Sequence, residues 1–196
     1  MRYNGGGLVR VAEYLIDLIG GGTVKGENII KILYNDKHTD SNFSYTGKKL
    51  QNSLEKISKV VFITTRGTAS ASEMVINALT PYFDVALVGE MTYGKPVGMN
   101  SMSFCDQTIV PITFKSANSQ DYGDYFLGMD VDCSAEDDCR HDFGLLHHDQ
   151  CHKVHLSILV VGQRRVCQCL GQSECSIHKI LLLALRQKQW HKDLLQ

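Results

Sequence analysis

The chain has 196 residues, a formal net charge of −1 and an ordinary hydrophobic content of 43%. This length suits one domain with a sizeable core. The balanced charge gives no electrostatic case for binding nucleic acid or an anionic membrane. No apolar run is long enough to span a bilayer, and no signal peptide is visible.

The first sixty residues alternate between patterned and polar stretches. Apolar side chains recur at helical spacing over residues 8–19, and the glycines at 20–22 are expected to end that helix. Residues 28–34 predict a strand. Residues 35–48 are mostly polar and predict a surface loop, which a short helix over residues 50–57 is expected to follow.

The centre of the chain predicts a strand–helix–strand unit. Residues 59–65 are apolar and β-branched and predict a buried strand of the parallel type. Residues 72–79 predict a helix that stops near Pro81, and residues 84–89 predict a second short strand. Because the order is strand, helix, strand, we expect a right-handed crossover in a parallel sheet.

Ser70 and Lys95 each follow one of these two strands directly, at the sheet edge where such folds carry ligands. A serine hydroxyl is a poor nucleophile until a base takes its proton. No histidine lies between residues 39 and 140, whereas a lysine can serve as the base if burial keeps its amine neutral. The N–H of Ala71, at the start of the helix, is placed to hold an oxyanion.

The same residues admit other interpretations. Ser70 and Glu73 match the capping box that closes a helix N-terminus, and a lysine in a turn is usually solvated. Residues 89–95 also match the phosphate-binding pattern G-x-x-x-x-G-K. Pro96 replaces the Ser or Thr that pattern requires for Mg²⁺, and a strand-like stretch follows where a helix should begin. Nucleotide binding is therefore disfavoured.

The segment after Lys95 predicts a hairpin. Residues 100–105 and 108–115 are its expected arms, around Asp106-Gln107. Pro111 indicates an edge position or a bulge, because proline cannot donate to a strand ladder. Residues 116–124 are expected to form a polar loop.

Three segments resemble, in order and spacing, the motifs of the carboxyl-terminal processing peptidases, or tail-specific proteases. They are YNGGG at residues 3–7, TRGTASASE at 65–73 and GEMTYGKPVG at 89–98. The resemblance covers roughly residues 2–143. It implies a serine endopeptidase on an α/β core of the crotonase (ClpP/crotonase) type, with parallel sheet strands and crossover helices.

The resemblance also implies roles for single residues. Ser70 corresponds to the nucleophile and Lys95 to the general base of a Ser–Lys dyad. The expected oxyanion-hole donors are the N–H groups of Gly5, Gly6 and Ala71. Many members carry a glutamine four residues after the lysine that orients it, whereas this chain has Met99 there. The resemblance therefore supplies no orienting partner for Lys95. It implies no cofactor and no metal.

The two ends of the chain depart from the family pattern. In the family an apolar strand ending in Asp precedes the glycine motif, often with a PDZ domain further upstream. We therefore expect a catalytic core that is partial at its N-terminus and spans residues 1–144. Residues 145–196 are expected to be a tail of unknown character, for which a frameshift is one hypothesis.

The alternative for the tail is a zinc module, because seven of the eight histidines lie after residue 140 and five of the seven cysteines after residue 138. The ligands of such a module would be Cys139, His141, His147, His148, Cys151, His152 and His155. Paired C-x-x-C motifs are absent from the sequence, which disfavours it. Cys105 and Cys133 lie well inside the matched core, and they are either a disulfide pair or plain buried thiols.

The sequence thus predicts hydrolysis of peptide bonds near protein C-termini through a Ser70 acyl-enzyme, with polypeptides as substrates. Nucleic acid is not an expected partner, and the oligomeric state stays open. The family resemblance favours a periplasmic or cell-envelope location. The alternative function is a non-catalytic binding or remnant domain of the same fold, inactive through truncation.

Overall fold

The computed structural model, which describes residues 1–135, contains the parallel sheet that the sequence predicts. β3 (Lys59–Thr64) pairs in parallel with β4 (Asp84–Gly89), and α2 (Ala71–Leu79) connects them. β9 (Cys133–Ser134) pairs in parallel with the other side of β4. The strand–helix–strand unit is confirmed, and its α/β character with it.

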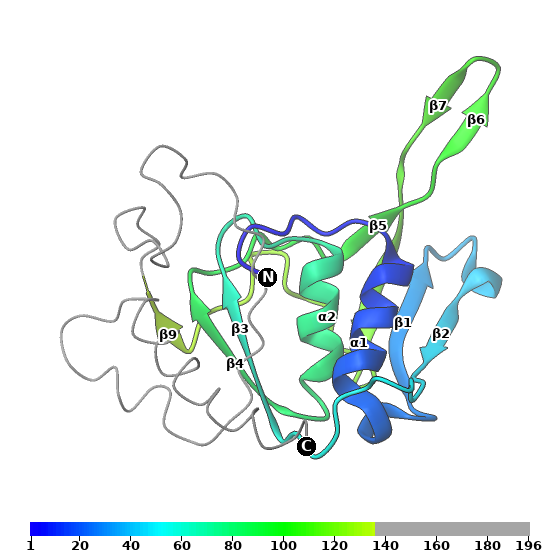
Figure 1. Cartoon of the computed structure of the whole chain (residues 1–196). Helices are drawn as coiled ribbons and strands as arrows, with labels where there is room; N and C mark the ends of the chain where they lie inside the picture. Colours follow the sequence, from blue (N-terminus) through cyan, green and yellow to red (C-terminus); the bar gives the residue numbers. More distant parts are fainter. Residues whose placement is uncertain (136–196) are drawn as a thin grey trace.

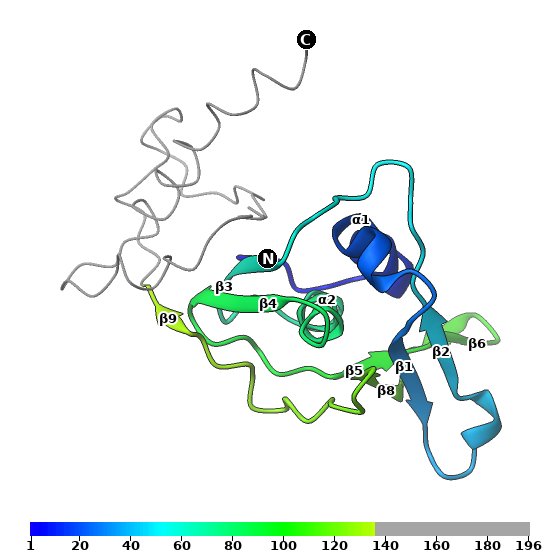
Figure 2. The same cartoon turned by 90° about the horizontal axis from the view of Figure 1, so that it is seen from below.

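A second, antiparallel sheet has the strand order β2-β1-β8-β5. Its strands are β1 (Asn28–Tyr34), β2 (Phe43–Thr46), β5 (Val97–Met99) and β8 (Ile112–Asn118). Figure 2 shows α2 between this sheet and the parallel pair β3–β4, with α1 (Val9–Val24) beside it. All nine residues of α2 are buried, since both sheets and α1 cover it. The helix that begins at Ser70 is therefore held on several sides.

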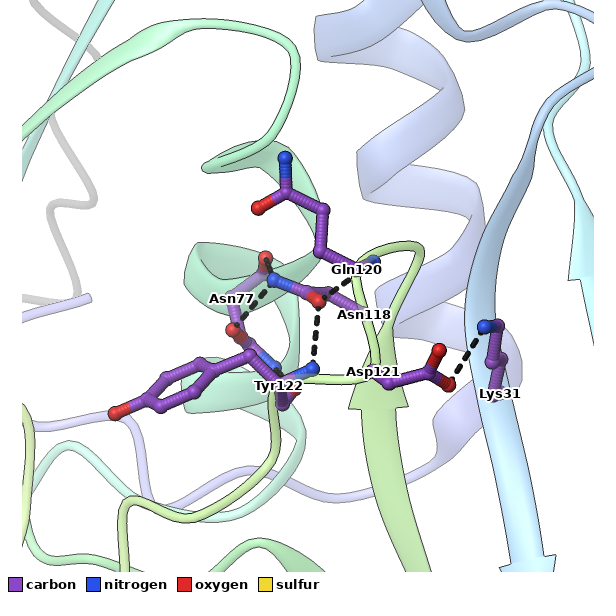
Figure 3. Close-up of polar contacts among 6 residues, drawn as sticks. All are labelled: Lys31, Asn77, Asn118, Gln120, Asp121 and Tyr122. Atoms are coloured by element: carbon purple, nitrogen blue, oxygen red, sulfur yellow. Dashed lines mark hydrogen bonds and ion pairs between the residues drawn. The ribbon is translucent and has the colours of Figure 1, made fainter.

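The lower end of α2 is also fixed by polar contacts (Figure 3). The side-chain amide of Asn118, at the end of β8, donates to the backbone carbonyl and the side-chain oxygen of Asn77 at 3.2 and 3.1 Å. Its oxygen accepts from the N–H groups of Gln120 and Tyr122, each at 3.0 Å. Asn77 in turn donates to the carbonyl of Tyr122 at 2.8 Å. This set of bonds ties α2, β8 and the following loop together.

The hairpin beyond Lys95 projects away from the body of the molecule (Figure 1). It consists of β6 (Met102–Phe104) and β7 (Gln107–Ile109), and all six of its strand residues are exposed. Phe104 lies opposite Gln107, so the turn is Cys105-Asp106, one residue earlier than predicted. The paired arms are shorter than predicted, because the second predicted arm is divided between β7 and β8, and β8 belongs to the antiparallel sheet.

The predicted end of the first helix at residues 20–22 is confirmed in part, because α1 has a non-helical break at Gly21, with φ 48° and ψ −127°, before helical backbone resumes to Val24. Other local predictions are wrong. The polar stretch 35–48 contains the short helical turn η1 (Thr39–Ser41) and strand β2. Residues 50–57 form turns and irregular backbone, because Leu54 N–H bonds across to Leu18 and Ser53 Oγ to the carbonyl of Asp17. β8 extends to Asn118, into the predicted loop.

Cys105 is free and exposed in the hairpin turn, so it is neither paired with Cys133 nor a buried thiol, the two alternatives that the sequence left open. The residues considered for a zinc module and the tail 145–196 lie outside the described residues. Within residues 1–135, no three His, Cys, Asp or Glu side chains gather as a metal site would need. In that same part, no helix is both long and apolar enough to cross a bilayer.

Candidate active site

Ser70 sits in a strained turn between β3 and α2. Its backbone has φ 57° and ψ −121°, a region that a residue with a Cβ seldom adopts. The turn before it is held by Thr68, whose N–H donates to the carbonyl of Thr65 at 2.8 Å and whose Oγ1 accepts from the N–H of Thr65 at 3.1 Å. Strain of this kind costs about 1–3 kcal/mol, persists only where the surroundings impose it, and is concentrated at functional sites.

Glu73 links the Ser70 turn to the loop that carries Lys95. Its Oε2 accepts hydrogen bonds from the N–H of Ser70 and the N–H of Lys95, each at 2.8 Å. Its Oε1 accepts from Thr92 Oγ1 at 2.6 Å and from the N–H of Gly94 at 2.7 Å. The side chain is fully buried, and four donors replace the water it has lost. The two predicted dyad residues thus share one carboxylate oxygen through their backbones.

Thr92 connects the lysine loop to the segment that precedes β9. Its hydroxyl donates to Glu73 and accepts from the N–H of Met129 at 2.8 Å, and its N–H donates to the carbonyl of Met129 at 3.2 Å. Gly94 has φ 94°, and a Cβ there would lie 2.5 Å from the carbonyl oxygen of Phe126. The loop therefore needs glycine at this position and rests directly on the backbone of residues 126–129.

The turn beneath the lysine loop carries a buried tyrosine. Tyr125 is 2% exposed, and its ring lies 6.3 Å from the ring of Tyr122. Burial raises the pKa of the Tyr125 phenol, and the negative charge of Glu73 adds to the rise. The phenol is therefore a neutral, buried group near the carboxylate of Glu73.

The glycine motif at the N-terminus lies against the Ser70 turn. Gly6 has φ 93°, and a Cβ there would lie 2.7 Å from both the carbonyl oxygen of Ala69 and the nitrogen of Ala71. The carbonyl of Asn4 accepts from the N–H of Ala69 at 3.2 Å. Two of the predicted oxyanion residues, Gly6 and Ala71, are therefore in contact with the nucleophile turn, and Gly5 is next to them.

The predicted oxyanion donors differ in how they are engaged. The N–H of Gly6 donates to the side-chain oxygen of Asn4 at 2.9 Å. The N–H of Ala71, the first residue of α2, makes no hydrogen bond within residues 1–135, as expected for the first turn of a helix. The N–H of Ala71 is therefore available for a further hydrogen bond, whereas that of Gly6 already has an acceptor in Asn4.

The Lys95 side chain is partly buried, and no carboxylate lies within ion-pair distance of it in the described part of the chain. Met99, where many relatives have glutamine, is 44% exposed on β5. The structure instead holds the lysine through its backbone, because Glu73 binds the N–H of Lys95 and of Gly94. Pro96 follows, and its carbonyl accepts from the N–H of Ser116 at 2.9 Å.

Sequence reasoning missed the wider role of Glu73 and the part played by Thr92. The capping-box pattern gave only the bond to Ser70, three residues away. The partners Thr92, Gly94 and Lys95 lie 19 to 22 residues further along, and no local pattern reports such contacts. One signal was available in the sequence. Glu73 is an acidic residue in the first turn of the predicted helix, three residues after the predicted nucleophile Ser70.

Comparison with known proteins identifies the family of the chain. The model of peptidase family S41 matches residues 1–133. The chain is 30% identical over 113 residues to the carboxy-terminal processing protease CtpA of Bacillus subtilis (strain 168), which covers 58% of this chain and 22% of that protein. A solved S41 protease from Bacteroides fragilis NCTC 9343 has a TM-score of 0.62 and 27% identity, over 69% of this chain and 36% of that one.

The photosystem II D1 C-terminal processing protease has a TM-score of 0.54 at 22% identity, over 69% of this chain and 33% of that one, and supports the fold alone. The α/β fold and the family match together define a domain of the peptidase class. The chain belongs to peptidase family S41. The predicted resemblance is thereby confirmed, and the chain spans 22% of the length of the CtpA relative.

Proposed function

We propose that this chain is the catalytic core of a serine endopeptidase that cleaves polypeptides near their C-termini. Ser70 is the nucleophile and Lys95 the general base, on a core of the crotonase type that extends over residues 1–144. The observation that carries the proposal is the shared carboxylate oxygen of Glu73, which accepts from the backbone N–H of both residues at 2.8 Å. Membership of peptidase family S41 supports the reaction class.

The proposed chemistry follows from the groups around the Ser70 turn. The amine of Lys95 takes the proton of Ser70 Oγ as the oxygen attacks the scissile carbonyl carbon. The oxyanion binds to the N–H of Ala71, with Gly5 and Gly6 as further donors. The lysine then protonates the leaving amine, which departs and leaves an ester on Ser70. Water hydrolyses that ester and restores the free hydroxyl.

The strained backbone of Ser70 supports this assignment over a structural role. A plain helix cap needs no positive φ, whereas Ser70 has φ 57° beside a fully buried acid. A turn of this kind presents the hydroxyl beyond the end of the strand and leaves the following N–H free for an oxyanion. The name of the CtpA relative supports C-terminal processing as the reaction. A periplasmic or cell-envelope location is proposed from the family resemblance alone.

Cleavage of an unstructured protein by the full chain tests the proposal. We expect Ser70→Ala and Lys95→Ala each to lower kcat/KM by about 10³-fold or more, because the two residues act as one unit. Ser72→Ala, two residues along in the same helix, and Lys37→Ala, on the surface, are matched controls and should retain activity. A serine-directed covalent probe should label Ser70 in the parent and not in Lys95→Ala.

Activity that survives Ser70→Ala would overturn the assignment. A folded parent chain that neither cleaves nor takes up the probe would favour the non-catalytic alternative, a binding domain of the same fold. Circular dichroism and thermal unfolding of every variant separate loss of chemistry from loss of structure.

A further inference from the structure

The strand that follows Lys95 forms the end of its sheet. β5 begins two residues after the lysine, and the sheet order β2-β1-β8-β5 places it at one edge. Within residues 1–135 its only strand partner is β8 (Figure 2). Its other side therefore carries backbone groups that no described strand satisfies, next to the proposed active site.

The register shows which backbone groups face outward. The N–H of Ser116 donates to the carbonyl of Pro96, so these two residues form a hydrogen-bonded pair. The next pairs are Val97 with Lys115 and Gly98 with Phe114. In an antiparallel ladder hydrogen-bonded and non-hydrogen-bonded pairs alternate. The N–H and C=O of Gly98 therefore point to β8, and those of Val97 point to the open edge.

The composition of β5 differs from that of a protected edge. Folded proteins commonly guard an exposed edge with lysine or another charge that discourages pairing. The strand reads Val97-Gly98-Met99 and carries no charge. The pairing changes register between Gly98 and Met99, because Met99 lies opposite Ile112 and Thr113 is the extra residue on β8. The alternation along β5 itself continues, so Met99 also presents its backbone outward. An uncharged edge with outward donors and acceptors suits an extended polypeptide, whose own N–H and C=O groups alternate in the same way.

We propose that the open edge of β5 binds the substrate polypeptide as an added strand, through the N–H and C=O of Val97. This inference rests on the proposed function, because β5 begins two residues after Lys95, the proposed general base. The affinity comes from hydrogen bonds of the substrate backbone. Substrates that differ in their side chains therefore bind with similar affinity to the edge of β5. Only every second substrate residue is bonded to the edge.

An ester scan tests this pairing without changing the protein. A labelled unstructured peptide binds to the Ser70→Ala chain, and binding is followed by fluorescence anisotropy. In each member of the series one peptide bond becomes an ester, which removes one N–H donor. We expect affinity to fall about fivefold at alternate positions near the scissile bond and to stay unchanged at the positions between. A flat profile, or an effect at consecutive positions, would overturn the proposal.

Two variants of one residue give the matching test from the protein side. Val97→Pro removes the outward N–H and leaves the ladder to β8 intact, whereas Val97→Ala removes side-chain atoms and keeps the N–H. We expect Val97→Pro to weaken peptide binding about fivefold and Val97→Ala less than about twofold. Equal effects would contradict the pairing. If Val97→Pro does not fold, the ester scan decides alone.

The two proposals fail in different ways. If the parent chain neither cleaves nor reacts at Ser70 but the period-two profile persists, the edge binds peptide and the proposed peptidase function is wrong. If cleavage depends on Ser70 and Lys95 but the profile is flat, the peptidase function stands and the strand pairing is wrong.

Discussion

The Ser70–Lys95 site and the β6–β7 hairpin are close in sequence, yet different kinds of hydrogen bond fix their backbones. Around the site, the fully buried side chains of Glu73 and Thr92 bond to backbone groups from distant loops. The hairpin is held by its own ladder, and all six strand residues are exposed. Buried polar bonds thus fix the relative positions of loops in the site, whereas the hairpin needs only local pairing.

The comparison predicts that a substitution at Glu73 has the largest effect. Glu73→Ala leaves four donors without an acceptor, including the N–H of Ser70 and of Lys95. We expect the free energy of unfolding to fall by about 4 kcal/mol and cleavage to be lost. Chemical denaturation and kcat/KM measure the two effects.

Glu73→Gln is the matched variant, because it keeps the shape and replaces one oxygen by a donor. It should fold better than Glu73→Ala and still lose most of its activity, since an amide cannot accept from all four donors. Wild-type activity in Glu73→Gln would show that the hydrogen bonds of Glu73 to the N–H groups of Ser70 and Lys95 do not position the dyad.

A Cβ at Gly6 should have the next largest effect. It would lie 2.7 Å from two backbone atoms of the Ser70 turn, and Gly6 has φ 93°. We expect Gly6→Ala to lower the free energy of unfolding by about 2 kcal/mol and kcat by more than it raises KM, because the turn that presents Ser70 must move.

Gly22→Ala is the control for Gly6→Ala, because no atom lies within 4 Å of its added Cβ and its backbone is not in the left-handed region. It should be neutral in activity. A Gly6→Ala chain with unchanged kcat would show that the glycine motif does not shape the nucleophile turn.

The strand–helix–strand unit β3–α2–β4 was predictable because the residue pattern of each element is contained within its own short segment. The apolar runs of β3 and β4 and the buried face of α2 each fall within ten residues. β2 was missed because only one of its four side chains, Tyr45, is partly buried, and its hydroxyl bonds to Asp17 on α1 at 2.6 Å. The predicted helix at 50–57 failed for a related reason, since contacts to Leu18 and Asp17 replace its own hydrogen bonds.

The sequence predicted the residues of the candidate site but not the hydrogen bonds that hold them together. Motif resemblance gave Ser70, Lys95 and the glycine loop. The carboxylate of Glu73 accepts hydrogen bonds from segments about twenty residues away. These bonds depend on how β4 places the lysine loop beside the start of α2. Only the three-dimensional arrangement shows that one carboxylate binds both backbones.

The Asn118 contacts at the far end of α2 should have an intermediate effect. Asn118→Ala removes four hydrogen bonds in a site that is 2% exposed (Figure 3). We expect a loss of about 2 kcal/mol in the free energy of unfolding and a smaller change in kcat, because the bonds fix α2 away from Ser70. Lys31→Gln, which breaks only a surface ion pair with Asp121, should cost less than about 1 kcal/mol.

The hairpin should tolerate change. Phe104 is 69% exposed, and β6 pairs only with β7 in the described residues. Phe104→Ser should therefore change the free energy of unfolding by less than about 0.5 kcal/mol and leave the cleavage of a short peptide unchanged. The matched change on the opposite arm, Ile109→Ser, at 52% exposure, should behave alike. A loss of more than about 2 kcal/mol in either variant would mean that the hairpin contributes to stability through contacts beyond its own ladder. In that case the contrast between a site held by hydrogen bonds from distant loops and a hairpin held only by its own pairing would not hold.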